Sequence, residues 1–548
     1  MILDINQIGT LIKEPANADL IAKAVEKHRK LAMHVNGVGA ENAIEQLTNV
    51  ESEEERELRK RLVRSNRSLF STMLRPFDKA FSAKGGSVFY DLPDVNAFTN
   101  YINEVNGVGL RTWLKKRWKN KFMTDPMGVI LIEVNDGRPE PKYKAVTSIH
   151  DYAFKGISLE YIIFKPVKGD QLKKMFPDVE FEVKDDNEYF RMIDDEKDVY
   201  IEKVGEEVRM IEELLVQNPI GDVPATLCSD MYDNESTAMM SPIEDVVDLA
   251  DEYLRDTSIH TIYKALHSYP VFWAFLPDCK FCDGTGKVED LDVTNGFSTC
   301  SKCHGHGKDI RKDVSKIIGL DIPEPDEANI TPPAGYIQTD VASWQQQREE
   351  LDWLQRLMHF ALWGTHTREQ ASNETATGRF LDSQPVNDRL DDFSGTIENI
   401  ETFHTDFIGR MLYPKTYKGS SVGLGRRYII ESPDVLWVRY QEARKAGSPV
   451  ATLDYLLTQF YESEFRSQPN QFAIYTKLMY VEPFIHLTST EVEALSVSED
   501  DKKKKFYFTE WLGEKEDAYI LMTPIAKLRE DLESYVAPKQ NNTVQTKT

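Results

Sequence analysis

Four of the five cysteines in the chain form two closely spaced pairs. The first pair is Cys279 and Cys282, the second is Cys300 and Cys303, and residues 283–299 separate them. Each CxxC turn presents two thiolates, and two such turns at this spacing can surround one metal ion tetrahedrally. Four protein ligands leave no position for water or substrate, which is typical of a structural site. The pattern therefore predicts one structural Zn²⁺ per chain.

The same short sequence follows both cysteine pairs. Asp283–Gly286 and His304–Gly307 both have glycine at their second and fourth positions. Glycine adopts positive φ readily, so we expect these residues to let the backbone fold over the metal. His304 and His306 are alternative ligands, but with four cysteines present we interpret them as surface residues. The fifth cysteine, Cys228, stands apart and is predicted to be a buried core thiol.

The doubled CxxCxGxG pattern resembles the cysteine-rich domain of J-domain co-chaperones. The resemblance covers about 30 residues, with two copies of the repeat where that family has four. The chain contains no His-Pro-Asp signature and no helical J-domain pattern. We therefore interpret this segment as a zinc module inserted into a different architecture.

Other short motifs do not have the context that their chemistry requires. Gly419–Gly423 fits G-x-S-x-G, but a nucleophile elbow needs a strand before it and a helix after it. Here a Lys- and Tyr-rich segment precedes the motif and an apparent strand, Arg427–Glu431, follows it, so we predict a flexible loop. P-loop and HExxH motifs and a convincing catalytic triad are absent. The sequence therefore predicts that the protein is not an enzyme.

Two charge runs allow more than one interpretation. Glu51–Ser71 begins with acids and becomes basic, an order that complements a helix dipole, and we predict a solvated helix. Asp500–Lys505 contains two acids followed by four lysines. We predict a solvated loop there, with a contact to nucleic acid or a partner as the alternative.

Composition limits the class of protein. With 41% hydrophobic and 10% aromatic residues among 548, the chain can form globular cores. It carries 66 Lys and Arg against 90 Asp and Glu, a formal net charge of −24. This acidic charge argues against a free-standing nucleic-acid binder, whose surface would be basic. It is compatible with a passage through which nucleic acid slides. We find neither a signal-peptide pattern nor an apolar stretch of membrane-spanning length, and expect no membrane association.

The elements around the cysteines alternate between helix and strand, so we predict an α+β protein. Strands are expected at Met127–Val134, Ile157–Pro166 and Val199–Val208, and a helix at Ala16–Val35 that ends at Gly37.

Three further helices are expected beyond this strand-rich region. Ser241 and Pro242 are typical of a helix start, and Tyr269-Pro270 interrupts that helix before the cysteines. Further helices are expected from Asp340 to Gly364 and from Pro385 onward.

This order of elements resembles the portal proteins of tailed double-stranded-DNA bacteriophages. The segments that carry the resemblance are Ser241–Asp245 at the start of an outgoing helix, Pro333–Ile337 before a returning helix, and Glu374–Arg379 ahead of a long helix. The zinc module, at the position of the clip, is not a general portal feature. The resemblance implies these parts: a wing-like α/β region (1–240), an outgoing stem helix (241–276), a clip-like region with the zinc module (277–335), a returning stem helix (336–364), a tunnel-loop region and long helix (365–431), a helical crown-like region (432–536) and a disordered tail (537–548).

The resemblance also implies a function without chemistry. Twelve copies would form a ring at one capsid vertex of the virion, acting as the channel for genome packaging and ejection. The ring would contact the terminase motor, neck proteins and the major capsid protein, and double-stranded DNA would pass through it without sequence preference. Arg368 and Arg379 are the candidate contacts to DNA in the channel, with an intersubunit salt bridge as the alternative for each. The competing hypothesis is a zinc-ribbon adaptor or co-chaperone-like protein that binds polypeptide.

Overall fold

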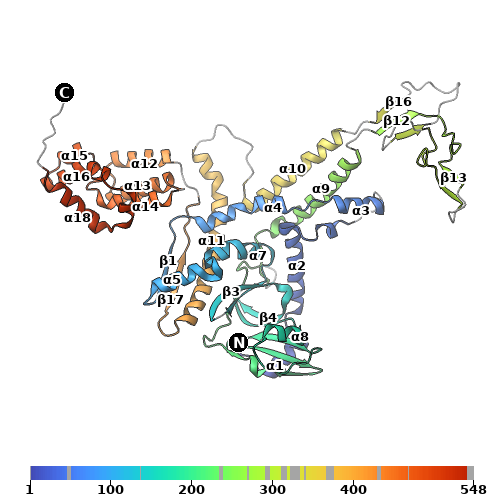
Figure 1. Cartoon of the computed structure of the whole chain (residues 1–548), viewed down its shortest axis with the longest axis horizontal. Coiled ribbons are helices and arrows are strands. Elements are labelled where there is room, and N and C mark those ends of the chain that lie inside the picture. Colours follow the sequence, from blue (N-terminus) through green and yellow to red (C-terminus); the bar gives the residue numbers. More distant parts are fainter. Residues whose placement is uncertain are drawn as a thin grey trace. The chain divides into compact units, whose positions relative to one another are not determined.

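The computed structural model contains both helices and sheets, which confirms the predicted α+β class. The chain divides into two compact units, Met1–Arg426 and Arg427–Thr548 (Figure 1). The residues that the structure describes are 2–45, 51–135, 137–233, 238–267, 271–289, 296–309, 317–320, 334–337, 341–365, 376–428, 433–466 and 468–539.

The first unit begins with helices. α1 (Ile5–Lys13) is followed by α2 (Ala18–Asn36), which ends at Gly37 with φ 74°, as predicted. The predicted continuous helix over Glu51–Ser71 is wrong, because α3 (Glu53–Leu62) and α4 (Arg67–Met73) are separate. Between them Asn66 is buried, and its side-chain amide donates to the carbonyl of Ala250 at 2.8 Å.

A ten-stranded sheet forms the centre of this unit. Its main strand order is β10-β8-β7-β5-β11-β2-β3, with β4, β6 and β9 paired to β5, β7 and β8. The predictions of β2 and β5 are confirmed, whereas the single strand predicted at Val199–Val208 is a hairpin that turns at Gly205, where φ is 60°. The strands are β2 (Val129–Asn135), β3 (Arg138–Lys144), β4 (Ile149–Lys155), β5 (Ser158–Phe164), β6 (Val167–Lys168), β7 (Glu188–Ile193), β8 (Lys197–Val204), β9 (Glu207–Met210), β10 (Val216–Gln217) and β11 (Ala225–Leu227).

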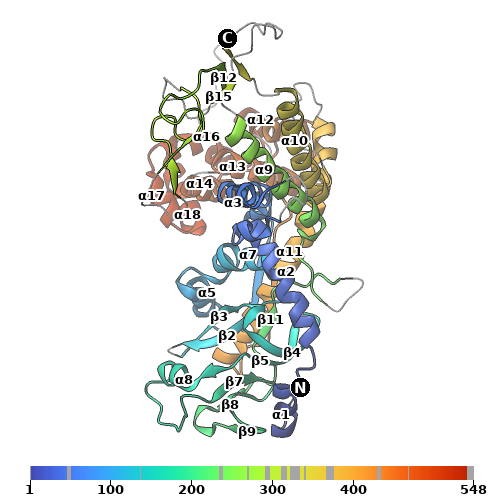
Figure 2. The same ribbon diagram turned by 90° about the vertical axis from the view of Figure 1, so that its right-hand side faces the viewer.

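Helices α1 and α2 lie beside the strands of this sheet (Figure 2) and pack into two different cores. Successive residues of a strand point to opposite faces, and β5 shows the consequence. Ile162 belongs to the core that includes Ile21 of α2, whereas Ile163 belongs to the core that includes Ile8 of α1. The first two helices are therefore held on opposite sides of the same strands.

A helical hairpin leads to and from the cysteine-rich segment. α9 (Val247–His267) lies antiparallel to α10 (Val341–Trp363), with a hydrogen bond from Gln355 to the Tyr253 hydroxyl at 2.6 Å (Figure 1). The end of α10 at Gly364, where φ is 65°, was predicted. The predicted start of α9 at Ser241 is wrong, because a 3-10 turn at Glu244–Val246 comes first.

A three-stranded sheet follows α9. The central strand β12 (Val271–Phe275) pairs in parallel with β15 (Ile317–Leu320) and antiparallel with β16 (Ala334–Ile337). Helix therefore fills the expected stem segment 241–276 only as far as His267, and strand β12 occupies its end. The Pro-rich stretch Asp321–Gly335 predicts an irregular connection. Residues 321–333 lie outside the described ranges, and the prediction is wrong at Ala334 and Gly335, which begin strand β16.

The longest helix of the described chain is α11 (Ala376–Leu412), which starts before the predicted residue Pro385. A proline removes one backbone hydrogen bond, yet this helix continues because its later turns are buried, among them Phe393 and Ile400. Glu401 accepts two hydrogen bonds from Arg111, at 3.0 and 2.9 Å. These contacts fix α11 against the α/β part of the unit.

The G-x-S-x-G segment was predicted as a flexible loop, and that prediction is wrong. Gly419–Gly423 is strand β17, which pairs antiparallel with β1 (Ser87–Asp91). The backbone of the motif is thus part of a two-stranded sheet and does not form a strand–turn–helix elbow. Of the apparent strand Arg427–Glu431, the structure describes only the first two residues.

The second unit is mostly helical in its described residues, as predicted. The run Asp500–Lys505 is not a loop but part of α16 (Glu499–Gly513), whose N-cap Ser498 accepts from the backbone amide of Asp501. Lys505 is buried and its Nζ lies 2.5 Å from Glu482 Oε1. The helices of this unit are α12 (Pro433–Lys445), α13 (Val450–Glu464), α14 (Pro469–Val481), α15 (Ser489–Glu493), α16, α17 (Asp517–Met522) and α18 (Ile525–Val536).

The predicted disordered tail begins with residues that make contacts. Lys539 Nζ lies 2.5 Å from Glu510 Oε1 and 4.0 Å from the centre of the Tyr535 ring. Residues 540–548 lie outside the described ranges. Within the described chain, no helix has both the length and the apolar character needed to cross a bilayer.

A buried histidine predicts how stability depends on pH. His404 of α11 is fully buried, and burial lowers its pKa from 6.5 to about 4. Because the unfolded chain takes up this proton near pH 6.5 and the folded chain does not, stability falls as pH drops from about 6.5 toward 4. We expect His404→Gln to lose about 2 kcal/mol of that dependence between pH 7 and pH 5, measured by urea unfolding at pH 7, 6 and 5. Identical pH profiles for the two proteins would contradict this account.

Candidate metal centre

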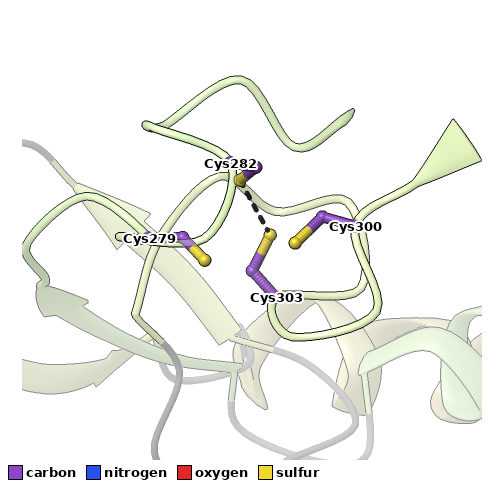
Figure 3. A group of neighbouring side chains, drawn as sticks. All are labelled: Cys279, Cys282, Cys300 and Cys303. Atoms are coloured by element: carbon purple, nitrogen blue, oxygen red, sulfur yellow. Dashed lines mark hydrogen bonds between the residues drawn. The ribbon is translucent and has the colours of Figure 1, made fainter. Parts of the chain in front are cut away.

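Two loops of the same design carry the four cysteines. Cys279–Gly286 leads into strand β13 (Lys287–Glu289), which pairs with β14 (Phe297–Thr299), and β14 leads into Cys300–Gly307. The two cysteine pairs are therefore connected through a β-hairpin, which brings the second loop back next to the first. Figure 3 shows the four side chains converging from these two loops.

The four sulfur atoms lie close enough to share one ion. All four Sγ atoms are within 4.8 Å of one another, and those of Cys282 and Cys303 are 3.6 Å apart. A tetrahedron with Zn–S distances near 2.3 Å has sulfur atoms about 3.8 Å apart. All four side chains are buried. The cluster thus has the donor atoms, spacing and enclosure of a four-thiolate metal site.

Backbone hydrogen bonds join the loops in a reciprocal pattern. The Cys279 amide donates to the carbonyl of Gly307 at 2.9 Å, and the Cys300 amide donates to the carbonyl of Gly286 at 2.9 Å. In addition, the amides of Gly286 and Gly307 each donate to the sulfur of the second cysteine of their own loop, Cys282 and Cys303, at 3.3 Å. Each loop therefore supports the other as well as its own thiolates.

The glycines after each cysteine pair are required by this close approach. Gly284, Gly286, Gly305 and Gly307 have φ values of 80°, 72°, 88° and 72°, which confirms the predicted positive φ. A Cβ atom on Gly286 would lie 2.4 Å from the carbonyl oxygen of Gly305, and one on Gly307 would lie 2.3 Å from that of Gly284. No other residue fits at these two positions without moving the opposite loop.

The local environment acts differently on two of the thiols. Burial raises the pKa of Cys282 to about 11. Burial also acts to raise the pKa of Cys300, but backbone amides of Cys303 and Lys302 stabilise its thiolate and bring the pKa down to about 7. A metal ion binds thiolates, so the amides aimed at the sulfur atoms favour the form that a metal requires.

The structure tests some of the predictions made for residues outside the cysteine cluster. His304 and His306 are exposed and lie outside the cluster, in agreement with the prediction that they are surface residues. Cys228 is confirmed as a buried thiol, and burial raises its pKa well above the usual range. Arg368 lies outside the described residues. Arg379 lies within α11, but the structure does not describe its side chain, so both DNA contacts stay predictions.

One group of basic residues was missed by the sequence motifs. Lys115, Lys116 and Arg117 lie in a stretch, residues 105–124, that contains six Lys and Arg and neither Asp nor Glu. The missing acids were the signal that could have identified this stretch. It corresponds to no motif with fixed spacing, so a search for catalytic or metal-ligand patterns does not find it.

Comparison with known proteins adds no family assignment. The chain matches no protein-family model and no curated protein sequence.

Metal analysis tests the cluster directly. We expect about one metal ion per purified chain, and we expect Cys279→Ser combined with Cys282→Ser to remove it, because two thiolates cannot hold the ion against competition from a chelator. Cys228→Ala, which removes a thiol far from the cluster in the sequence, should leave the metal content unchanged. An unchanged metal content in the double variant would show that the assignment is wrong.

A glycine substitution tests the loop packing. We expect Gly286→Ala to speed the loss of metal to a chromogenic chelator by about tenfold or more, since it disturbs the amide that supports Cys282. Gly296→Ala is the matched control, because Gly296 also has positive φ (67°) but a Cβ atom added to it would have no other atom within 4 Å. Equal rates for the two variants would mean that backbone conformation alone, and not the contact with Gly305, determines metal retention.

Proposed function

We propose that the chain is the subunit of a portal ring, a structural virion protein that forms a channel for packaging and ejecting double-stranded DNA at one capsid vertex. The order of its parts supports this. An α/β part precedes helix α9, a small β module, the returning helix α10, the long helix α11 and a helical second unit. In portal proteins the wing, stem, clip, returning stem, long helix and crown follow in the same order.

The helical hairpin is the observation that carries the proposal. α9 and α10 are packed on each other through Tyr253 and Gln355, and the metal module lies between them in the sequence. On α10, Trp353 and Phe360 are 53% and 41% exposed. They lie seven residues apart and hence on one face of the helix. A neighbouring subunit in a ring would cover this apolar face, as exposed apolar patches commonly indicate.

In this proposal the metal is Zn²⁺ and its role is structural. The described core of the module consists of the four cysteines and the partly buried Val288, which is too little apolar surface to hold a fold. Metal binding then supplies folding free energy that packing does not. A clip stiffened in this way would give the terminase motor and the neck proteins a fixed surface on which to dock.

The proposed ring performs no reaction. Stem helices would line the channel, Arg368 and Arg379 would face DNA, and contacts to the major capsid protein would hold the ring in the virion. The excess of acids in the chain would keep DNA from adhering to the wall.

A second candidate is a zinc adaptor that binds polypeptide. Two aromatic side chains of the metal module favour it, because Phe281 and Phe297 are 58% and 54% exposed. Such side chains can anchor a peptide. A ring subunit and an adaptor differ in their mass in solution, which is the simplest way to distinguish them.

Particle mass tests the ring. Twelve subunits of 62.9 kDa give a particle of about 750 kDa, which mass photometry resolves from a monomer, and negative stain should show annuli. Trp353→Ser combined with Phe360→Ser should shift the population toward smaller species, because the covered face loses its apolar contacts. A stable monomer or dimer of the unmodified chain at micromolar concentration would exclude the ring and leave the adaptor.

A further inference from the structure

Positive charge is concentrated in one part of this acidic chain. Residues 58–124 contain fourteen Lys and Arg against four Asp and Glu, although acids exceed bases by 24 over the whole sequence. Asp78 is the single acid between residues 58 and 90, and none occurs between residues 105 and 124. A local excess of this size is the electrostatic pattern of a surface that meets a polyanion.

Local structure turns the basic side chains of this region outward. α6 (Leu110–Trp113) continues through one π-helical turn, Leu114–Trp118, into α7 (Lys119–Thr124). Leu114 and Trp118 are buried, whereas Lys116 and Arg117 are exposed and Lys115 is half-buried. A π turn places an extra residue in the helix and is frequent at functional sites. Here it presents two exposed cations, Lys116 and Arg117, with the half-buried Lys115 next to them.

Contacts with the end of α2 bring a second group of cations to the same region. The Asn120 side chain of α7 donates to Asn36 at 2.9 Å. A Cβ atom on the adjacent Gly37 would lie 3.4 Å from Cβ of Arg67. α2 therefore contacts α4 and α7 together, as Figure 1 shows.

The ion pair of Lys119 with Asp78, at 2.6 Å, connects α7 to the turn Arg75–Ser82. Asp78, the one acid of residues 58–90, is therefore already paired with a cation of α7. Arg75 and Lys79, both exposed, lie in this turn.

These residues are available for a partner. We define the basic surface as the six side chains Arg67, Arg75, Lys79, Lys115, Lys116 and Arg117. Within the described part of the chain, none of the six forms a salt bridge. In contrast, the lysines of the other basic run, Lys502 and Lys504, are paired with Glu499 and Glu533.

We propose that the basic surface binds the phosphate backbone of double-stranded nucleic acid without sequence preference. Protein–protein interfaces are enriched in aromatic residues and arginine and depleted in lysine, whereas three of the six residues are lysines and none is aromatic. Phosphate contacts need no more than positive charge. The inference rests on charge and position and does not depend on ring formation, so it can hold even if the ring is wrong.

The chain's own charge determines the character of this binding. The many acids elsewhere repel a duplex, so the affinity is weak. The contacts between cations and phosphates make the affinity fall as salt is added. Each phosphate contact contributes about −0.9 to the slope of log affinity against log salt concentration. The local basic surface, not the net charge, determines where the duplex lies.

Fluorescence anisotropy with a labelled 30-base-pair duplex of mixed sequence, titrated with the full chain between 25 and 200 mM NaCl, measures this binding. The variant K115Q/K116Q/R117Q should weaken binding at least tenfold at the lowest salt concentration. It should also make the salt slope shallower by about 2 to 3, because three phosphate contacts are lost. A duplex of different sequence should bind equally well.

The control removes the same charge elsewhere. K502Q/K503Q/K504Q changes the net charge by the same amount in the second unit. It should leave duplex affinity and salt slope as in the unmodified chain. Circular dichroism checks that both variants are folded. Absence of duplex binding by the unmodified chain at 25 mM NaCl would overturn the proposal. So would equal weakening by both variants, which would mean that only net charge matters. If K115Q/K116Q/R117Q changed particle mass but not duplex affinity, the surface would be a contact between copies of the chain and the proposal would be wrong.

Discussion

The convergence of four thiols in two loops is the constraint that shapes the middle of this chain. The two cysteine loops have little apolar material of their own with which to form a core, and their described core is the thiols themselves with Val288 against them. Everything else in the module follows from bringing the sulfur atoms together. The hairpin β13–β14 returns the second loop to the first, and the glycines after each cysteine pair permit the backbones to touch. The helical hairpin then has a defined structure at its end.

Net charge and charge distribution give different information about this protein. An excess of 24 acids describes how the molecule as a whole repels polyanions, as the wall of the proposed channel would require. The net charge does not reveal that the residues of the basic surface lie near the end of α2, where helices far apart in sequence meet. The two properties are compatible in one protein, because a passage for nucleic acid needs a surface that does not retain its cargo and can still have a place where the duplex is guided.

The sequence predicted those features that depend on local chemistry. The cysteine cluster, its glycines, the buried Cys228, β2, β5 and the ends of α2 and α10 follow from side chains close together in the sequence. The errors arose where tertiary contacts decide. Gly419–Gly423 is a strand because β1, more than 300 residues earlier, pairs with it, and Pro385 lies inside α11 because burial holds that helix together. Lys505 can be buried because Glu482, the residue that follows helix α14, pairs with it. The basic surface was missed because its consecutive cations at 115–117 fit no motif of fixed spacing, and because its other members come near them through the tertiary contacts of Asn36, Gly37 and Asp78.

The reciprocal contact between the two cysteine loops has a consequence for the order in which the chain folds. Only a short hairpin separates the loops, so the conformational entropy lost in bringing them together is small compared with that of pairing β1 with β17. Two backbone hydrogen bonds, from Cys279 to Gly307 and from Cys300 to Gly286, also form only when both loops are in place. The module is therefore a small, local and cooperative folding unit that can reach its native form while the long-range pairings of the first unit are still incomplete.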